Sequence, residues 1–96
     1  MTLKDLIEII DTVDEDMIVY AKRIEGNFKT TSDAVILDLT DEERSMPTKT
    51  ISEIKCPGFD YFLEVFLIKE VLEDYTSSSD LLIKTERVIY YAEFDA

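Results

Sequence analysis

The hydrophobic and polar residues at the start of the chain recur with the period of a helix. Four apolar residues lie at helical spacing on one side: Leu3, Leu6, Ile7 and Ile10. Lys4, Asp5, Glu8 and Asp11 take the other side. Thr2, with Asp5 three residues later, is typical of an N-cap followed by an acid at the third helical position. The pattern predicts an amphipathic helix over residues 3 to 12.

Two runs rich in β-branched and aromatic residues follow, at 17–24 (MIVYAKRI) and 34–39 (AVILDL). Glu25-Gly26-Asn27 is a turn signal after the first run. The two runs are predicted to form an antiparallel hairpin. The second run has few polar side chains, so we expect it to be central in the sheet or covered on both faces. Residues 40–49 are predicted to be a charged loop, and 50–54 (TISEI) is a candidate short third strand.

The stretch from residue 56 to 66, CPGFDYFLEVF, begins with a turn signal at Cys56-Pro57-Gly58. Asp60 is a favourable N-cap residue for a helix that would follow. Five apolar or aromatic residues are then spaced 4, 3, 4 and 3 apart: Tyr61, Val65, Ile68, Leu72 and Tyr75. This spacing predicts one helix over 61–75. The alternative is a short strand over 61–65 and a helix from about 66; the single helix is preferred because no capping residue lies near Val65.

The last segment, residues 79–93, is predicted to be a second helix. Ser77 followed by Asp80 is a variant of the capping box, and TSSSD at 76–80 suits a turn between two helices. The expected buried stripe is Leu81, Leu82, Thr85, Val88, Ile89 and Ala92. Together these patterns predict a single α+β domain over residues 1–96. It has an N-terminal helix, an antiparallel hairpin with a candidate short third strand, and two C-terminal helices packed on one sheet face.

Some bulky residues fall outside the buried stripes of the two C-terminal helices. Phe62 and Phe66 lie on the side opposite the stripe of the first helix, and they would also share a face of a strand. Ile83 and Tyr90 fall on the far side of the last helix, close to Arg87. Aromatic, arginine and aliphatic residues together are favoured at binding hot spots. These five residues are therefore predicted to contact a partner.

The charge of the chain narrows the class of partner. Twenty-two acidic residues against ten basic ones give a formal net charge of −12. Nucleic acid and anionic membrane surfaces should be repelled, whereas a basic protein should be attracted. Asp41, Glu42 and Glu43 in the charged loop are candidate contacts for such a protein. The alternative interpretation is that the charge only keeps the protein soluble and monomeric.

Few residues suggest catalysis or metal binding. The chain has no histidine and one cysteine, Cys56, which is interpreted as structural because only Lys55 beside it could lower its pKa. No glycine-rich phosphate loop or metalloprotease motif is present, so neither an enzyme, a cofactor nor a dedicated metal site is expected. On the predicted helix Glu64 falls in the apolar arc near Tyr75, which makes these two residues candidate ligand contacts; alternatively, Glu64 only complements the helix dipole.

Two features bear on the origin of the chain. Asp5 and Glu8 interrupt what would be the apolar part of a signal peptide, so a cytoplasmic location is expected. TLKDLIEIID at the start, GFDYFLEVFLIKEVLEDY at 58–75 and VIYYAEFDA at 88–96 resemble a group of small acidic bacterial proteins that are uncharacterised. The resemblance implies a bacterial cytoplasmic protein, and it carries no activity, cofactor or catalytic residue.

Three functions are compatible with these observations. The leading hypothesis is a non-catalytic, acidic protein-binding module with a basic partner, for example an inhibitor of the immunity or antitoxin type. The second is a small-ligand or metal-responsive domain, or an enzyme, that uses carboxylates and tyrosines such as Glu64 and Tyr75. The third is a self-associating protein that forms a homodimer through the same apolar residues.

Overall fold

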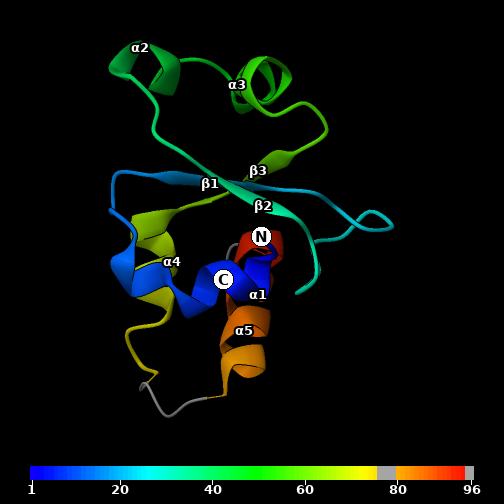
Figure 1. Cartoon of the computed structure of the whole chain (residues 1–96), viewed down its shortest axis with the longest axis vertical. Helices are drawn as coiled ribbons and strands as arrows, with labels where there is room; N and C mark the ends of the chain where they lie inside the picture. The colour runs from blue at the N-terminus through cyan, green and yellow to red at the C-terminus, as the bar shows by residue number, and fades with distance from the viewer. Residues whose placement is uncertain (76–79, 95–96) are drawn as a thin grey trace.

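The computed structural model describes residues 1–75 and 80–94. Figure 1 shows three layers, with α2 and α3 on one side of a sheet and α1, α4 and α5 on the other. The elements in chain order are α1 (Leu3–Glu8), a 3₁₀ turn η1 (Ile10–Thr12), β1 (Ile18–Ala21), β2 (Ala34–Leu37), α2 (Asp41–Arg44), α3 (Thr48–Lys55), β3 (Asp60–Glu64), α4 (Val65–Val71) and α5 (Leu81–Phe94). The predicted α+β class is confirmed.

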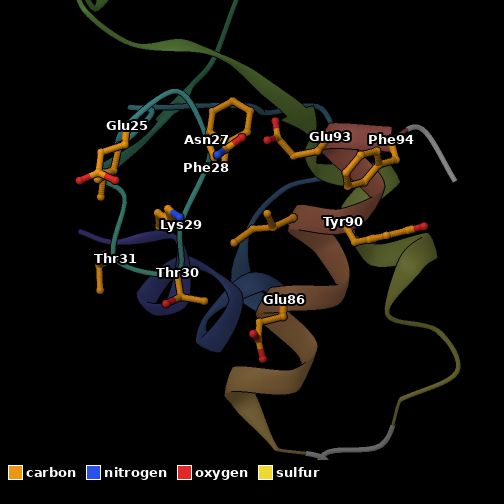
Figure 2. A pocket seen from close by; sticks show the side chains of 12 residues that line it. Glu25, Asn27, Phe28, Lys29, Thr30, Thr31, Glu86, Tyr90, Glu93 and Phe94 are labelled. Carbon is orange, nitrogen blue, oxygen red and sulfur yellow. The ribbon is translucent and has the colours of Figure 1, made fainter.

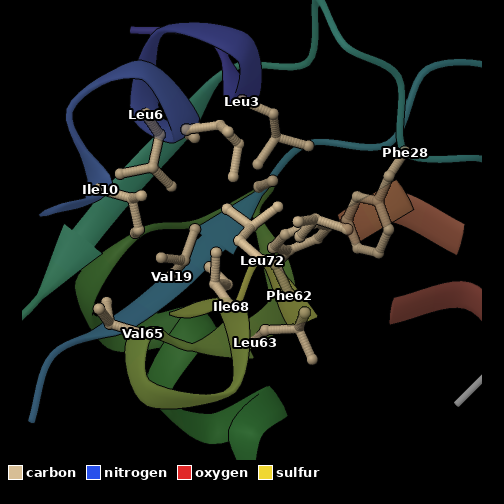
Figure 3. Close-up of a cluster of buried hydrophobic side chains, with 14 residues drawn as sticks. Leu3, Leu6, Ile10, Val19, Phe28, Phe62, Leu63, Val65, Ile68 and Leu72 are labelled. Atoms are coloured by element: carbon tan, nitrogen blue, oxygen red, sulfur yellow. The ribbon is translucent and has the colours of Figure 1, made fainter. Parts of the chain in front are cut away.

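The sheet has the strand order β2-β1-β3, and both pairings are antiparallel. All four residues of the central strand β1 are buried, because successive side chains point to opposite faces that are both covered. Val19 and Ala21 enter a larger core formed with α1, α4 and α5 (Figure 3). Ile18 and Tyr20 enter a smaller core with Ile51 of α3. The two cores fix the positions of both helical layers.

The predicted hairpin is confirmed, but β2 is an edge strand and β1 is the central one. Of the two alternatives expected for residues 34–39, a central position in the sheet is therefore wrong, and cover on both faces holds in part. Val35 and Leu37 pack against the smaller core and Ile36 against the larger core, so β2 is partly covered on both faces. Their half-burial explains why the run contains few polar residues.

Residues 60–64 form the third strand, so the prediction of one helix over 61–75 and of Asp60 as its N-cap is wrong. The alternative, a strand followed by a helix, is confirmed, although α4 already ends at Val71. No side chain caps the start of α4. The Val65 N–H, at the first position of α4, donates at 2.9 Å to the carbonyl of Met17, the residue before β1, so the chain that leads into β1 satisfies this N–H.

A β-bulge determines which residues of β3 are buried. The register shifts between Val19 and Tyr20 of β1, which pair with Leu63 and Tyr61, so Phe62 is an additional residue on β3. As a result Phe62 and Leu63 both enter the larger core instead of facing opposite sides (Figure 3).

Residues 50–54, the candidate third strand, lie instead in α3. Both edges of β1 are already paired, with β2 and with β3. The segment covers the second sheet face and buries Ile51 there, while Ile54 is 66% exposed.

Side chains cap the starts of α1, α2 and α5, and of these three caps only the one at α1 matches the prediction. Thr2 and Asp5 form the expected capping box, and α1 with η1 covers the predicted helix over 3–12. The loop predicted at 40–49 contains the short helix α2, which Thr40 and Glu43 cap reciprocally. At the start of α5 the Asp80 carboxylate accepts the Leu82 and Ile83 N–H groups at 2.8 and 3.2 Å. Residues 76–79 of the turn predicted at 76–80, including Ser77, lie outside the described residues.

Helix α5 turns most of its predicted stripe inward. Thr85 and Val88 are fully buried, and Leu81, Ile89 and Ala92 pack against the larger core. The Thr85 hydroxyl donates to the Leu81 carbonyl at 2.8 Å, which satisfies a polar group that is shielded from water. The prediction for Leu82 is wrong, since its side chain is 44% exposed.

Candidate functional site

The most exposed apolar surface of α5 consists of three large side chains. Ile83, Tyr90 and Phe94 are 56%, 51% and 67% exposed, and we call them the outer stripe. Their spacing of 7 and 4 places them on one side of the helix. The Tyr90 and Phe94 rings contact each other with centroids 4.8 Å apart. The Arg87 guanidinium lies 5.6 Å from the centre of the Tyr90 ring, within the range of a cation–π contact.

A groove runs beside the outer stripe, between the loop that follows β1 and the second half of α5 (Figure 2). Its volume is about 720 Å³, and its lining comprises residues 24, 25, 27–31, 86, 89, 90, 93 and 94. Two outer-stripe residues, Tyr90 and Phe94, line the groove, so the stripe and the groove form one continuous surface. Phe28 is buried, and Ile89 is half-buried; both therefore contribute an apolar base.

Arg23, in the loop after β1, forms hydrogen bonds to both α5 and β3 beside the groove. The Arg23 Nη1 donates to Glu93 of α5 at 2.8 Å, and its Nε donates to Asp60 of β3 at 3.2 Å. Its guanidinium also stacks 4.1 Å from the centre of the Phe28 ring. Since these contacts use the Glu93 carboxylate, they leave Glu25 and Glu86 as the lining carboxylates that have no ion-pair partner among the described residues.

The loop wall of the groove contains a tight turn with an unusual residue. Ile24 and Asn27 exchange two backbone hydrogen bonds of 2.7 and 3.2 Å. The two residues between them have positive φ angles, 54° at Glu25 and 85° at Gly26, which is the geometry of a type I′ turn. Glycine adopts this conformation freely, whereas it is uncommon for glutamate.

The structure separates the residues predicted to bind a partner. Ile83, Arg87 and Tyr90 lie near one another on α5, as the periodicity predicts, and Phe66 on α4 is 43% exposed. Phe62 is only 2% exposed and packs edge-to-face on Phe28, so the prediction that it shares an exposed face with Phe66 is wrong. The two positions lie on either side of the junction between β3 and α4, and the face-sharing rule for i and i+4 does not hold across such a junction.

The predicted acidic contacts lie in the other helical layer. Asp41, Glu42 and Glu43 belong to α2, on the opposite side of the sheet from α5 (Figure 1). Glu43 forms an ion pair with Lys55 at 2.8 Å, and this hydrogen bond, aided by Thr40, lowers the pKa of the Glu43 carboxyl. Asp41 and Glu42 are exposed. These acids are therefore not adjacent to the outer stripe.

The two candidate ligand contacts, Glu64 and Tyr75, are not brought together. Glu64 ends β3, pairs with Ile18 and accepts a hydrogen bond from the Tyr61 hydroxyl, on the sheet face of the smaller core. Tyr75 packs against the larger core, on the opposite face. The expectation that Glu64 lies near Tyr75 is wrong because it assumed a helix through residue 64.

The environment of Cys56 agrees with the structural interpretation. The thiol is buried in the smaller core, and burial raises its pKa. Within residues 1–75 and 80–94, no group of three or more histidine, cysteine or acidic side chains could hold a metal ion. In the same part of the chain, no helix is both long enough and apolar enough to cross a bilayer.

Burial in the smaller core should make the protein less stable at alkaline pH. Burial raises the pKa values of Cys56, Tyr20 and Tyr61, and for Tyr61 the hydrogen bond to Glu64 adds to the effect. The unfolded chain then loses these protons at lower pH than the folded protein. The free energy of unfolding should therefore fall as pH rises above the ordinary thiol pKa of 9.0.

Urea denaturation between about pH 7 and about pH 10.5 measures this dependence. The variant Tyr61→Phe, which has no ionisable hydroxyl at this position, should show a shallower decline. A free energy of unfolding that stays constant or rises over this range would contradict the burial of Cys56, Tyr20 and Tyr61 in the smaller core.

No family model matches the chain, and no curated protein or solved structure matches it. The candidate site therefore depends on the geometry alone. Sequence reasoning missed three of its components: Phe94, Glu25 and the groove. Phe94 follows Tyr90 by four residues, and this spacing could have placed it on the outer stripe if the predicted helix had extended beyond residue 93. No local signal places the loop beside α5.

Proposed function

We propose that this protein is a non-catalytic, acidic protein-binding module whose basic partner docks on the outer stripe of α5. The observation that carries the proposal is that Ile83, Tyr90 and Phe94 are each more than half exposed on one side of a single helix. Large apolar side chains that gather in this way mark interaction surfaces, and tyrosine is among the residues enriched at binding hot spots. Phe66 extends the candidate surface onto α4, whereas Phe62 is no longer part of it.

The net charge of −12 favours a basic partner. Such a charge speeds the encounter with a positively charged protein and disfavours nucleic acid and anionic membranes. Asp41 and Glu42, in the other helical layer, would contribute through the overall field and not through contacts at the outer stripe. An inhibitor of a basic protein, of the immunity or antitoxin type, is one concrete form of this function. A bacterial origin and a cytoplasmic location remain predictions from the sequence.

The dependence of partner capture on salt tests this proposal. The immobilised protein should capture a basic protein from a lysate of its native host at about 0.05 M salt. The captured amount should fall at least about tenfold at about 0.5 M salt, because ions screen the attraction between opposite charges. Capture of the same protein in equal amounts at both concentrations would contradict the proposal.

The same stripe would also be buried if the protein self-associated, and salt distinguishes the two functions. Two copies that each carry −12 repel one another, so added salt should strengthen a homodimer and weaken a complex with a basic partner. Light scattering over a range of protein and salt concentrations measures this. A dimer that becomes more stable as salt increases would favour self-association over the proposed partner.

A further inference from the structure

The lining of the groove beside the outer stripe indicates which kind of partner segment would bind there. This inference rests on the proposed function. We propose that the groove binds a basic amphipathic segment of the partner, with apolar side chains on the base and cationic side chains at Glu25 and Glu86. The two carboxylates belong to different walls, the loop and α5 (Figure 2). The segment therefore has at least two lysine or arginine residues, one for each wall.

The groove combines the two kinds of surface that such a segment needs. Ile24, Phe28 and Ile89 provide apolar contacts for aliphatic side chains and for the stems of lysine or arginine. Glu86 lies between Ile83 and Tyr90 in sequence, three and four residues from them, so its carboxylate emerges from the outer stripe itself. A cation at Glu86 can therefore be held while its stem packs on the stripe.

Four charged side chains line the groove: Glu25, Lys29, Glu86 and Glu93. The Glu93 carboxylate forms an ion pair with Arg23, and Arg23 forms a second ion pair with Asp60. Lys29 lies on the loop wall and opposes the binding of a cation. The two remaining carboxylates, Glu25 and Glu86, outnumber this one ammonium group. Replacing Lys29 with glutamine should consequently strengthen the binding of a basic segment, an effect opposite in sign to the loss of either carboxylate.

Glu25 provides an independent reason to assign binding to the loop wall. It occupies a left-handed position, φ 54°, followed by Gly26, in a turn for which Asn-Gly is the favoured pair. Glutamate there costs stability. An exposed carboxylate at a groove edge, kept in an unfavourable conformation, indicates that the side chain serves the surface and not the fold. The change Glu25→Asn should thus stabilise the protein and weaken binding at the same time.

A synthetic peptide tests the inference without the natural partner. The probe is a peptide of about twelve residues made of lysine, leucine and alanine, and its control has glutamine in place of lysine. In backbone amide NMR the basic peptide should produce saturable shifts at residues 24–31 and 83–94, whereas the glutamine peptide should not. Shifts centred on residues 41–55, or equal shifts with both peptides, would overturn the inference.

Four single substitutions sharpen the test. Glu86→Gln and Glu25→Asn should each weaken peptide binding by about two- to fivefold, while Lys29→Gln should strengthen it by a similar factor. Glu42→Gln, an exposed acid on α2, removes the same charge far from the groove and should change the affinity by less than about 1.5-fold. Glu25→Asn should also raise Tm by roughly 2–6 °C. Unchanged affinity in either Glu86→Gln or Glu25→Asn would overturn the assignment.

The groove assignment and the proposed function can be contradicted separately, because different variants test them. If the natural partner is lost from an outer-stripe variant but still binds the Glu25 and Glu86 variants normally, the groove assignment is wrong and the proposed function stands. If the outer-stripe variant retains the partner, the proposed function itself is wrong. Both outcomes can be read in one capture experiment with the full chain.

Discussion

Replacing Phe62 with alanine is expected to lower the free energy of unfolding by about 3–5 kcal/mol. The side chain is 2% exposed and packs edge-to-face on Phe28 with ring centroids 5.0 Å apart. Its removal deletes apolar contacts and leaves a cavity in the larger core. A domain of this size is stable by about 5–15 kcal/mol, so the variant should be close to unfolding. Urea denaturation followed by circular dichroism measures the change.

Phe66 provides the matched control for this prediction. It is also a phenylalanine, four residues later, but it is 43% exposed on α4. Phe66→Ala should change the free energy of unfolding by less than about 1 kcal/mol. Losses of similar size in the two variants would mean that residues 60–71 are not a bulged strand followed by a helix. The assignment of Phe62 to the core would then be wrong.

Replacing both Ile83 and Tyr90 with serine is expected to weaken binding of the captured partner by about 2 kcal/mol or more, which is about thirtyfold. Both side chains are more than half exposed, so their loss should barely affect folding. A partner that covers the outer stripe would lose two of its three large apolar contacts there. Isothermal titration with the purified partner gives the affinity, and circular dichroism confirms that the variant is folded.

Ile54→Ser is the control for the double variant. Ile54 is 66% exposed on α3, in the helical layer on the other side of the sheet. Its loss removes a comparable exposed apolar group but should leave the affinity unchanged. If Ile54→Ser weakened binding as much as the double variant does, exposed apolar groups anywhere on the protein would contribute equally to binding. The outer stripe would then have no special role.

Local patterns predicted the parts of the fold that local physics determines. The capping box at Thr2 and the periodicity over residues 3–12 correspond to α1 and η1. The β-branched runs correspond to the hairpin, and the periodic C-terminal segment corresponds to α5. The helix α2 carries a signal of the same kind, the pair Thr40 and Glu43, which could have been recognised within the charged loop.

The wrong predictions concern residues whose structure depends on distant partners. Residues 60–64 have helical spacing, but they extend because β1 has a second edge available for pairing. Short apolar runs are ambiguous between helix and strand, and this pairing decides the conformation of β3. Residues 50–54 lie in a helix that covers the second sheet face and buries Ile51 against it. Neither the free edge of β1 nor the uncovered sheet face can be inferred from the few residues around each segment.

As with the fold, the sequence predicted only those parts of the candidate site that lie within one local segment. Ile83, Arg87 and Tyr90 share one helix, so periodicity alone brings them together. The groove requires the loop after β1 to lie beside α5, as in the ion pair between Arg23 and Glu93, which are 70 residues apart. The strained turn at Glu25 depends equally on backbone angles that the residue type disfavours. These features emerge only from the folded chain.

Hydroxyl-radical footprinting of the free protein and of its complex with the captured partner tests the central claim most directly. In the free protein Phe66, Tyr90 and Phe94 should be oxidised, while Phe62 should not. On binding, Tyr90 and Phe94 should become protected, and Met46, exposed between α2 and α3, should remain reactive. Protection of Met46 with Tyr90 and Phe94 still reactive would contradict the assignment of the partner to the outer stripe of α5.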